Sequence, residues 1–247
     1  MKRNQIVLNN LLFDADHQAG EPQLAMLQRV VDLNITNAEI RREYFFDLNA
    51  EMAGIKSFAE AHDLKLFYSV PDALLVDGGL NPKLAMYFDE AEKMGVSVIK
   101  FNVNENPTLT EEQAAQLADY AARVDQINVE NNQIKSTGSI EAILAFMQVM
   151  ENHQLPIGYV YDMGNWRYVD DDEVEAAKAL TKYVRYIHVK DDLGTGSQTK
   201  TVPLGRGDIK WQSILAILPT DVPVALEYPV TSEQEIGDGI EHLLSEV

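Results

Sequence analysis

The chain contains no cysteine, and this absence removes several chemistries at once. Disulfide bonds, thiolate metal ligands and a cysteine nucleophile are all excluded. No stretch approaches the roughly 18 consecutive apolar residues that a membrane-spanning helix needs. The apolar run near the start is interrupted by Asn9 and Asn10, and no small-residue cleavage site follows it. We therefore expect a cytoplasmic protein that has neither a secretory signal nor a membrane partner.

Basic residues are also scarce, because 20 Lys and Arg stand against 39 Asp and Glu, for a net charge of −19. Nucleic-acid affinity depends largely on Lys and Arg that neutralise phosphates, so an acidic chain predicts no nucleic-acid partner. The alternative, a local basic groove in an acidic protein, stays open. No heptad pattern or large apolar stripe compels self-association, and a homo-oligomer is left open as well.

Linkers and low-complexity tracts are missing, and strand-like and helix-like segments alternate along the whole chain. Strands are predicted at Gln5–Leu12, Ala38–Phe45, Lys65–Val70, Ser97–Val103, Gln126–Asn131, Ile157–Met163, Val184–Val189 and Pro223–Tyr228. Amphipathic helices are predicted at Pro82–Met94, Glu111–Arg123, Ile140–Glu151 and Asp172–Tyr183. Eight such units in 247 residues predict an α/β fold, a single (β/α)8 TIM barrel over residues 1–247. A doubly wound sheet is the alternative, but no glycine-rich turn follows the first strand.

Four chemically similar residues close the last four predicted strands: Glu130, Asp162, His188 and Glu227. A parallel barrel gathers the carboxyl ends of its strands around one pocket, so we expect these side chains to meet there. Three carboxylates and an imidazole are typical ligands of one divalent cation. Each residue alone has a plainer explanation: a hydrogen-bonded core histidine, an Asx turn at Asp162, or buried ion pairs of the glutamates. Buried charges must nevertheless be paired or coordinated, which favours a shared metal site.

Strand alternation predicts which way these side chains point. Tyr186, His188 and Lys190 share one face of their strand, and Val160 shares a face with Asp162. The other faces are apolar and suit packing against helices, so the four metal-site candidates can all point into the barrel. On the second predicted strand, alternation puts Glu39, Arg41 and Glu43 on one face, and the last lies nearest the carboxyl end. An internal pair between Arg41 and a carboxylate is the alternative there.

Polar residues near other strand ends are predicted to bind substrate. They are Glu43, Lys100, Asn102, Asn165 and Lys190. A lysine at such a position can bind a hydroxyl, a carboxylate or a phosphate, or it can neutralise the acidic cluster.

At this point the sequence resembles a known family, the xylose isomerase-like TIM barrels, which include sugar phosphate isomerases and epimerases and the apurinic-site endonucleases of family 2. The resemblance covers essentially the whole chain. The segments that carry it are IRREYF, GYVYDMGN, YIHVKD, VPLGRGDIKW and ALEYP. The family's metal ligands are Glu, Asp, His and Glu at the ends of strands five to eight, and they map in the same order onto Glu130, Asp162, His188 and Glu227.

The resemblance implies a divalent-metal-dependent isomerase or epimerase that acts on a small sugar, sugar acid or sugar phosphate. In the ketose 3-epimerases of the family the two glutamates are also the acid/base pair, roles that would fall on Glu130 and Glu227. One removes a proton beside the carbonyl and the other returns it after a metal-stabilised enediolate has formed. The oxygen-rich ligand set suits Mn, Mg, Co or Zn equally.

Two departures from those epimerases leave the reaction open. Asn165 stands where they carry a histidine, and Lys190 and its neighbours stand where they carry an arginine. The alternative on the same site is a dehydratase, a lyase acting on an inosose or a keto sugar acid. An apurinic-site endonuclease would need a zinc cluster with several more histidines than the five in this chain. A non-catalytic sugar-binding barrel is the last alternative.

Overall fold

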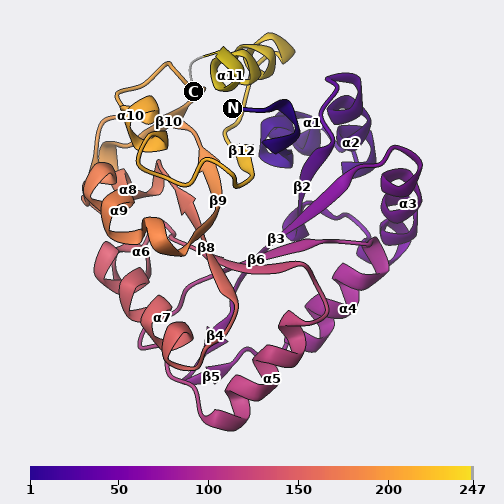
Figure 1. Cartoon of the computed structure of the whole chain (residues 1–247). Helices are drawn as coiled ribbons and strands as arrows, with labels where there is room; N and C mark the ends of the chain where they lie inside the picture. The colour runs from indigo at the N-terminus through magenta and orange to yellow at the C-terminus, as the bar shows by residue number, and fades with distance from the viewer. Residues whose placement is uncertain (246–247) are drawn as a thin grey trace.

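A closed barrel of eight parallel strands forms the centre of the molecule (Figure 1). The computed structural model describes residues 1–245. Around the barrel the strands follow the order β1-β12-β9-β8-β7-β6-β3-β2. Their bounds are β1 (Ile6–Asn9), β2 (Asn37–Arg41), β3 (Lys65–Ala73), β6 (Val98–Asn102), β7 (Gln126–Glu130), β8 (Ile157–Asp162), β9 (Val184–Val189) and β12 (Val224–Leu226). All eight predicted strands are present, and the predicted (β/α)8 barrel is confirmed.

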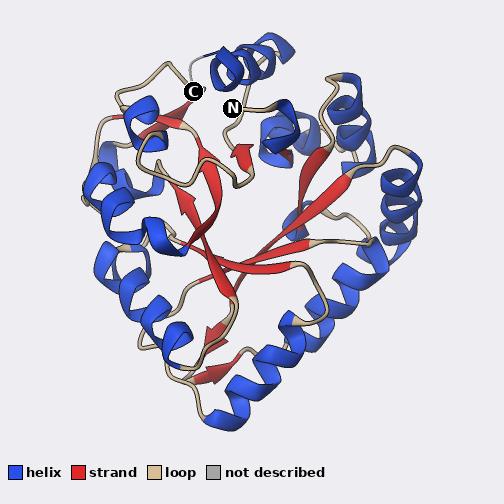
Figure 2. Cartoon of the chain, in the orientation of Figure 1, coloured by secondary structure: helices blue, strands red, loops and turns tan. Residues whose placement is uncertain are grey.

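Helices surround the strands on the outside of the barrel (Figure 2). The longer ones are α2 (Gln23–Asp32), α3 (Leu48–Ala61), α4 (Leu84–Met94), α5 (Glu111–Ala121), α7 (Ile140–Asn152), α9 (Glu173–Leu180) and α11 (Glu233–Ser245). Shorter ones are α1 (Asp14–Gln18), α6 (Lys135–Gly138), α8 (Asn165–Tyr168) and α10 (Trp211–Leu215). The Thr110 side chain caps α5 by accepting from the Gln113 N–H, and Gly95 ends α4 at φ 72°.

Side chains of alternating strand positions separate into two apolar layers. The larger layer lies between the strands and the helices. The smaller one fills the barrel interior and consists of Val7, Phe67, Val98, Val160, Tyr186 and Ala225. Because the side-chain period of a strand is two, residues two or four positions further along the same strand also point inward, toward the carboxyl end. The predicted facing of the strands is therefore confirmed.

Two small antiparallel hairpins extend the loops that follow β3 and β9. The first consists of β4 (Leu75–Val76) and β5 (Gly79–Leu80), and the second of β10 (Asp191–Leu193) and β11 (Lys200–Val202). The Asp191 carboxylate accepts hydrogen bonds from the backbone N–H groups of residues 205, 207 and 209. This buried carboxylate ties the loop that follows the second hairpin to the end of β9.

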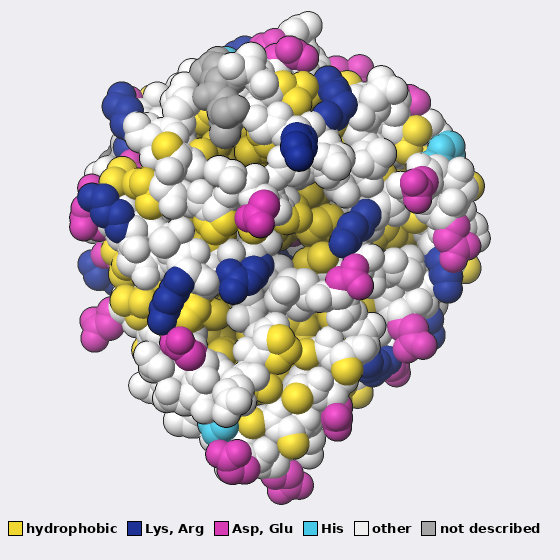
Figure 3. All heavy atoms as spheres, viewed as in Figure 1, with side chains coloured by type: hydrophobic (Ala, Val, Ile, Leu, Met, Phe, Trp, Pro, Cys, Tyr) yellow, Lys and Arg dark blue, Asp and Glu magenta, His cyan; other side chains and the backbone are white. Residues whose placement is uncertain are grey.

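On the face shown in Figure 3, the Lys and Arg side chains stand as separate groups with Asp and Glu side chains between them. None of the helices within residues 1–245 combines the length and the hydropathy that a bilayer crossing needs.

Gly158 on β8 gives a direct test of the interior packing. A Cβ atom added there would lie 2.2 Å from Asn128 Oδ1 and 2.7 Å from Arg185 Cγ. We expect Gly158→Ala to lower the free energy of unfolding by about 1–3 kcal/mol, measured by denaturant titration, because overpacking forces these neighbours to move. Gly237→Ala is the matched control, since no heavy atom lies within 4 Å of its added Cβ. This helical replacement should be neutral or stabilising by up to about 1 kcal/mol. Equal stability of the two variants would contradict the packing described.

Candidate metal centre

Four side chains from separate strand ends converge at the carboxyl end of the barrel. Glu130, Asp162, His188 and Glu227 each offer one ligand atom, and these atoms all lie within 4.8 Å of one another. All four residues are buried; His188 and Asp162 are 0% exposed. Glu130 and Asp162 are the last residues of β7 and β8, His188 is the penultimate residue of β9, and Glu227 directly follows β12. The structure thus brings together the whole predicted ligand set.

The imidazole of His188 is held from both sides. Its Nδ1 lies 2.7 Å from Glu130 Oε1 and 3.1 Å from Glu227 Oε2, so this nitrogen faces the acids. Its Nε2 lies 2.9 Å from Glu39 Oε2, and the Tyr186 hydroxyl donates to the same oxygen. Burial disfavours the charged ring, but the carboxylates of Glu39, Glu227 and Glu130 outweigh it and raise the pKa of His188 well above its usual value.

Glu39 is a buried contact of the His188 imidazole that the sequence analysis did not single out. It was placed on the inward face of β2, but only Glu43 of that face was expected to meet a ligand. Glu39 is 0% exposed, and its carboxylate orients the imidazole from behind. Such a second carboxylate fixes the tautomer and the ring orientation of a metal-binding histidine. The sequence feature that could have indicated Glu39 is a carboxylate within a predicted strand.

Asp162 uses its two oxygens for two different tasks. Oδ1 accepts from the backbone N–H groups of Gly164 and Asn165 at 3.0 and 3.1 Å, which is the Asx turn that the sequence offered as an alternative. Oδ2 lies 2.6 Å from Lys190 Nζ, on the side of the other acids. Burial raises the pKa of Asp162 to about 7, although the Lys190 charge opposes that rise. Turn formation and membership of the acidic cluster are therefore compatible.

Each of the two glutamates has its own cationic partners. Lys100 Nζ donates to Glu130 Oε2 at 2.5 Å, whereas Arg41 Nη1 and Lys190 Nζ lie 2.9 and 3.0 Å from Glu227 oxygens. Burial works against both ionised carboxylates. For Glu130 the charges of Lys100 and His188 outweigh the effect of burial, and the pKa of this carboxyl falls to about 2. Lys190 and His188 do the same for Glu227, whose pKa falls well below its usual value. Both glutamates are therefore ionised at neutral pH.

This donor set fits a divalent cation. It supplies three carboxylates and one imidazole, which is the mixture of hard oxygen and nitrogen ligands that Mn, Mg, Co and Zn accept. Glu130 Oε1 and Asp162 Oδ2 accept no hydrogen bond of acceptable geometry, although cationic groups lie beside them. Two buried oxygens without such bonds are free to act as ligands. Of the chain's five histidines, all within the described residues, His188 alone belongs to the cluster.

A cavity of about 390 Å³ opens above the cluster, and all five predicted substrate-binding residues line it. Glu43 does not continue β2, because the strand ends at Arg41 and a single 3-10 turn follows it. The Glu43 carboxylate lies at the rim, 2.9 Å from Arg41 Nε. The predicted internal pairing of Arg41 is therefore present, with two partners, since Arg41 also contacts Glu227.

The two predicted amides line the cavity, but their NH2 groups and the Asn165 side-chain oxygen are already used by the protein. Asn102 Nδ2 donates to the Pro71 carbonyl at 2.6 Å. Asn165 Nδ2 donates to the Asn131 carbonyl, and its Oδ1 accepts from Gln133. Their hydrogen bonds hold the loops that surround the site.

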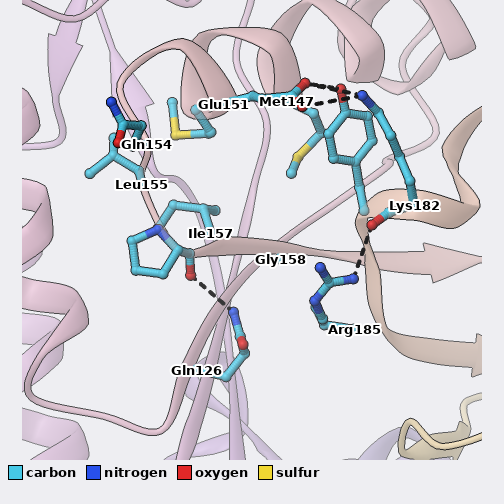
Figure 4. A pocket seen from close by; sticks show the side chains of 12 residues that line it. Gln126, Met147, Glu151, Gln154, Leu155, Ile157, Gly158, Lys182 and Arg185 are labelled. Atoms are coloured by element: carbon cyan, nitrogen blue, oxygen red, sulfur yellow. Dashed lines mark hydrogen bonds and ion pairs between the residues drawn. The ribbon is translucent and has the colours of Figure 1, made fainter.

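A second cavity, of about 410 Å³, lies where β7, β8 and β9 begin, at the opposite end of the barrel (Figure 4). Lys182 there pairs with Glu151, and Arg185 donates to the backbone carbonyls of Lys182 and Val184. It contains none of the four clustered residues. We therefore take the cavity above the acidic cluster, and not this second cavity, as the candidate active site.

Comparison with known proteins agrees with the fold. A family model described as xylose isomerase-like TIM barrel matches residues 85–246, which is more than half of the chain. The chain belongs to this family. A search of curated protein sequences found no match.

Solved structures share the fold at low sequence identity. An IolI protein with a bound zinc atom is 16% identical with a TM-score of 0.72, and the match covers 98% of this chain and 97% of that one. The probable 3-DHS dehydratase AsbF from Bacillus anthracis is 11% identical with a TM-score of 0.70, over 98% and 99% of the two chains. D-psicose 3-epimerase from Clostridium cellulolyticum H10 is 16% identical with a TM-score of 0.62, over 96% and 89%.

The support that Glu39 gives to His188 predicts an effect on metal affinity. We expect Glu39→Gln to weaken binding of Mn²⁺ or Zn²⁺ by about 10–100-fold, measured by isothermal titration calorimetry, because the imidazole loses its orienting charge. Glu43→Gln is the control, since this rim carboxylate contacts Arg41 but has no contact with His188 among the described residues. Unchanged metal affinity in the Glu39 variant would show that the carboxylate has no supporting role.

Proposed function

We propose that the protein is a divalent-metal-dependent isomerase or epimerase of a small carbohydrate. The observation that carries the proposal is the placement of two ionised glutamates, Glu130 and Glu227, which both line one cavity and both contact Nδ1 of the His188 imidazole. They come from strands that β8 and β9 separate, so they approach a substrate from different sides. Two bases that reach one carbon from different sides can move a proton between its faces or between neighbouring carbons.

A divalent cation held by Glu130, Asp162, His188 and Glu227 would polarise the substrate carbonyl and stabilise the negative charge that develops beside it. One glutamate then removes the proton from the carbon next to the carbonyl. The other glutamate first takes up a proton from solvent and delivers it to the opposite face of that carbon or to the neighbouring carbon, and the first glutamate returns its own proton to solvent. Lys100 and Arg41 keep these carboxylates in place through the contacts at 2.5 and 2.9 Å. The surrounding burial strengthens each of these electrostatic interactions.

The lyase alternative uses the same first step. After proton removal, a hydroxyl on the next carbon leaves as water instead of a proton returning. Lys190 supports this alternative, because its ammonium group lies 3.0 Å from Glu227 and can donate to a departing hydroxyl. The structural similarity to the probable 3-DHS dehydratase shows that the fold is compatible with such an enzyme.

The proposal is tested by incubating the protein in D₂O with ketoses, sugar acids and inososes, each with Mn, Mg, Co or Zn. We expect metal-dependent uptake of deuterium beside the carbonyl, followed by mass spectrometry and NMR. Glu227→Gln should reduce that uptake by at least about 10²-fold, because a general base is lost. Glu175→Gln, on the exposed side of α9 and paired with Lys178, is the control.

The product distinguishes the two enzyme classes. An isomerase or epimerase conserves the mass of its substrate, apart from deuterium, and a dehydratase releases one water. Absence of exchange with every substrate and metal, in protein that carries a stoichiometric ion, would overturn the proposal in favour of a binding protein.

A further inference from the structure

Three hydrogen-bond donors form a row on the half of the barrel wall that carries no metal ligand. Arg41 on β2 is in register with Ser69 on β3, and Ser69 is in register with Lys100 on β6. Residues in register on neighbouring parallel strands point to the same side of the sheet. All three line the cavity above the acidic cluster, and Ser69 is 2% exposed. A guanidinium, a hydroxyl and an ammonium group thus lie side by side.

The barrel order puts Ser69, on β3, across the barrel from β9 and its His188, whereas Lys100 and Arg41 on either side of Ser69 also contact the ligands Glu130 and Glu227. The ligands come from the consecutive strands β7, β8 and β9 and from the end of β12, and the row comes from β6, β3 and β2. A small substrate whose reacting end lies at the metal ligands would therefore extend its other end toward the row.

The row keeps donors that the rest of the protein does not use. Among residues 1–245, no partner is found for Arg41 Nη2 or for the Ser69 hydroxyl, and Lys100 Nζ donates only to Glu130. The amides of the cavity wall are by contrast occupied, as Asn102 and Asn165 show. The wall thus offers charged donors but few free amides, a combination that favours an anionic oxygen ligand over neutral hydroxyls.

Phosphate sites of the usual barrel kind are filled by the protein's own carboxylates. In many TIM barrels the loops after the seventh and eighth strands and a short helix hold a phosphate through backbone N–H groups. Here the N–H groups of Gly205 and Gly207, in the loop after the seventh strand, donate to Asp191, and the Thr231 N–H, in the loop after the eighth, donates to Glu235. The cavity wall has three cations against four carboxylates, and Glu39 behind His188 adds a fifth, so a divalent ion would balance the negative charge of the site.

We propose that Arg41, Ser69 and Lys100 form a carboxylate subsite, and that the substrate is an unphosphorylated sugar acid whose carboxylate lies at the end remote from the reacting carbonyl. This inference rests on the proposed function for the position of the reacting end. It selects one substrate class from the three that the fold family allows.

Three ketoses test the subsite, because they share one ketol end and differ only at the far carbon. D-fructuronate carries a carboxylate there, D-fructose a hydroxymethyl group and D-fructose 6-phosphate a phosphate. We expect the Mn²⁺-loaded protein to bind D-fructuronate at least about tenfold more tightly than either of the others, measured by isothermal titration calorimetry, because hydrogen bonds to charged groups are the strong ones.

Ser69→Ala is the sharpest variant, since it removes a donor and leaves every charge in place. It should reduce the affinity for D-fructuronate by about tenfold while leaving the affinities for Mn²⁺ and D-fructose unchanged. Ser57→Ala, on the exposed face of α3, is the matched control. Equal affinity of Ser69→Ala and the unaltered protein for D-fructuronate would overturn the assignment of the row.

The other outcomes separate this inference from the proposed function. Equal or tighter binding of D-fructose or D-fructose 6-phosphate, or no binding of D-fructuronate, overturns the subsite even if deuterium exchange with a neutral ketose supports the enzyme. Selective binding of D-fructuronate without any deuterium exchange supports the carboxylate subsite and counts against the proposed enzymatic reaction.

Discussion

The structure depends on the compensation of buried negative charge at one end of the barrel. Four carboxylates, those of Glu39, Glu130, Asp162 and Glu227, are at most 5% exposed and surround one imidazole. Removing a carboxylate from water costs several kcal/mol unless cations or hydrogen bonds replace the lost hydration. Lys100, Lys190 and Arg41 supply part of that compensation, and the geometry of the remaining oxygens suits a divalent ion.

The fold makes this concentration of charge possible because the apolar layers are elsewhere. Helices cover the outside of the strands, and six apolar side chains fill the barrel interior below the site. The inward positions nearer the carboxyl ends of the strands are left for polar residues such as Glu39, Lys100 and Glu130. The order of the strands around the barrel then decides which side chains meet: the metal ligands come from one half of the cavity wall, and the donors Arg41, Ser69 and Lys100 come from the other half.

Much of the fold could be predicted from residue patterns. Alternation assigned Tyr186 to the barrel interior and His188 to the site because the period of a strand is two, whatever the surroundings. The helix cap at Thr110 and the helix end at Gly95 depend on local backbone chemistry, so a sequence pattern can predict them as well. The reading of β2 was wrong at its end. The apolar and charged alternation continues through Glu43, but the chain turns after Arg41, and no local signal marks that turn.

For the site, the sequence by itself determined which residue types stand at the strand ends, because spacing and alternation are properties of the chain alone. It could name Glu130, Asp162, His188 and Glu227 as candidates for a common ion. Only the tertiary structure decided their partners: Glu39 behind the imidazole, Arg41 on Glu227, and the register that aligns Arg41, Ser69 and Lys100. The physical reason is that hydrogen bonds and ion pairs act over a few ångströms, here between residues such as Arg41 and Glu227 that are 186 positions apart in the chain. Closure of the barrel sets those distances.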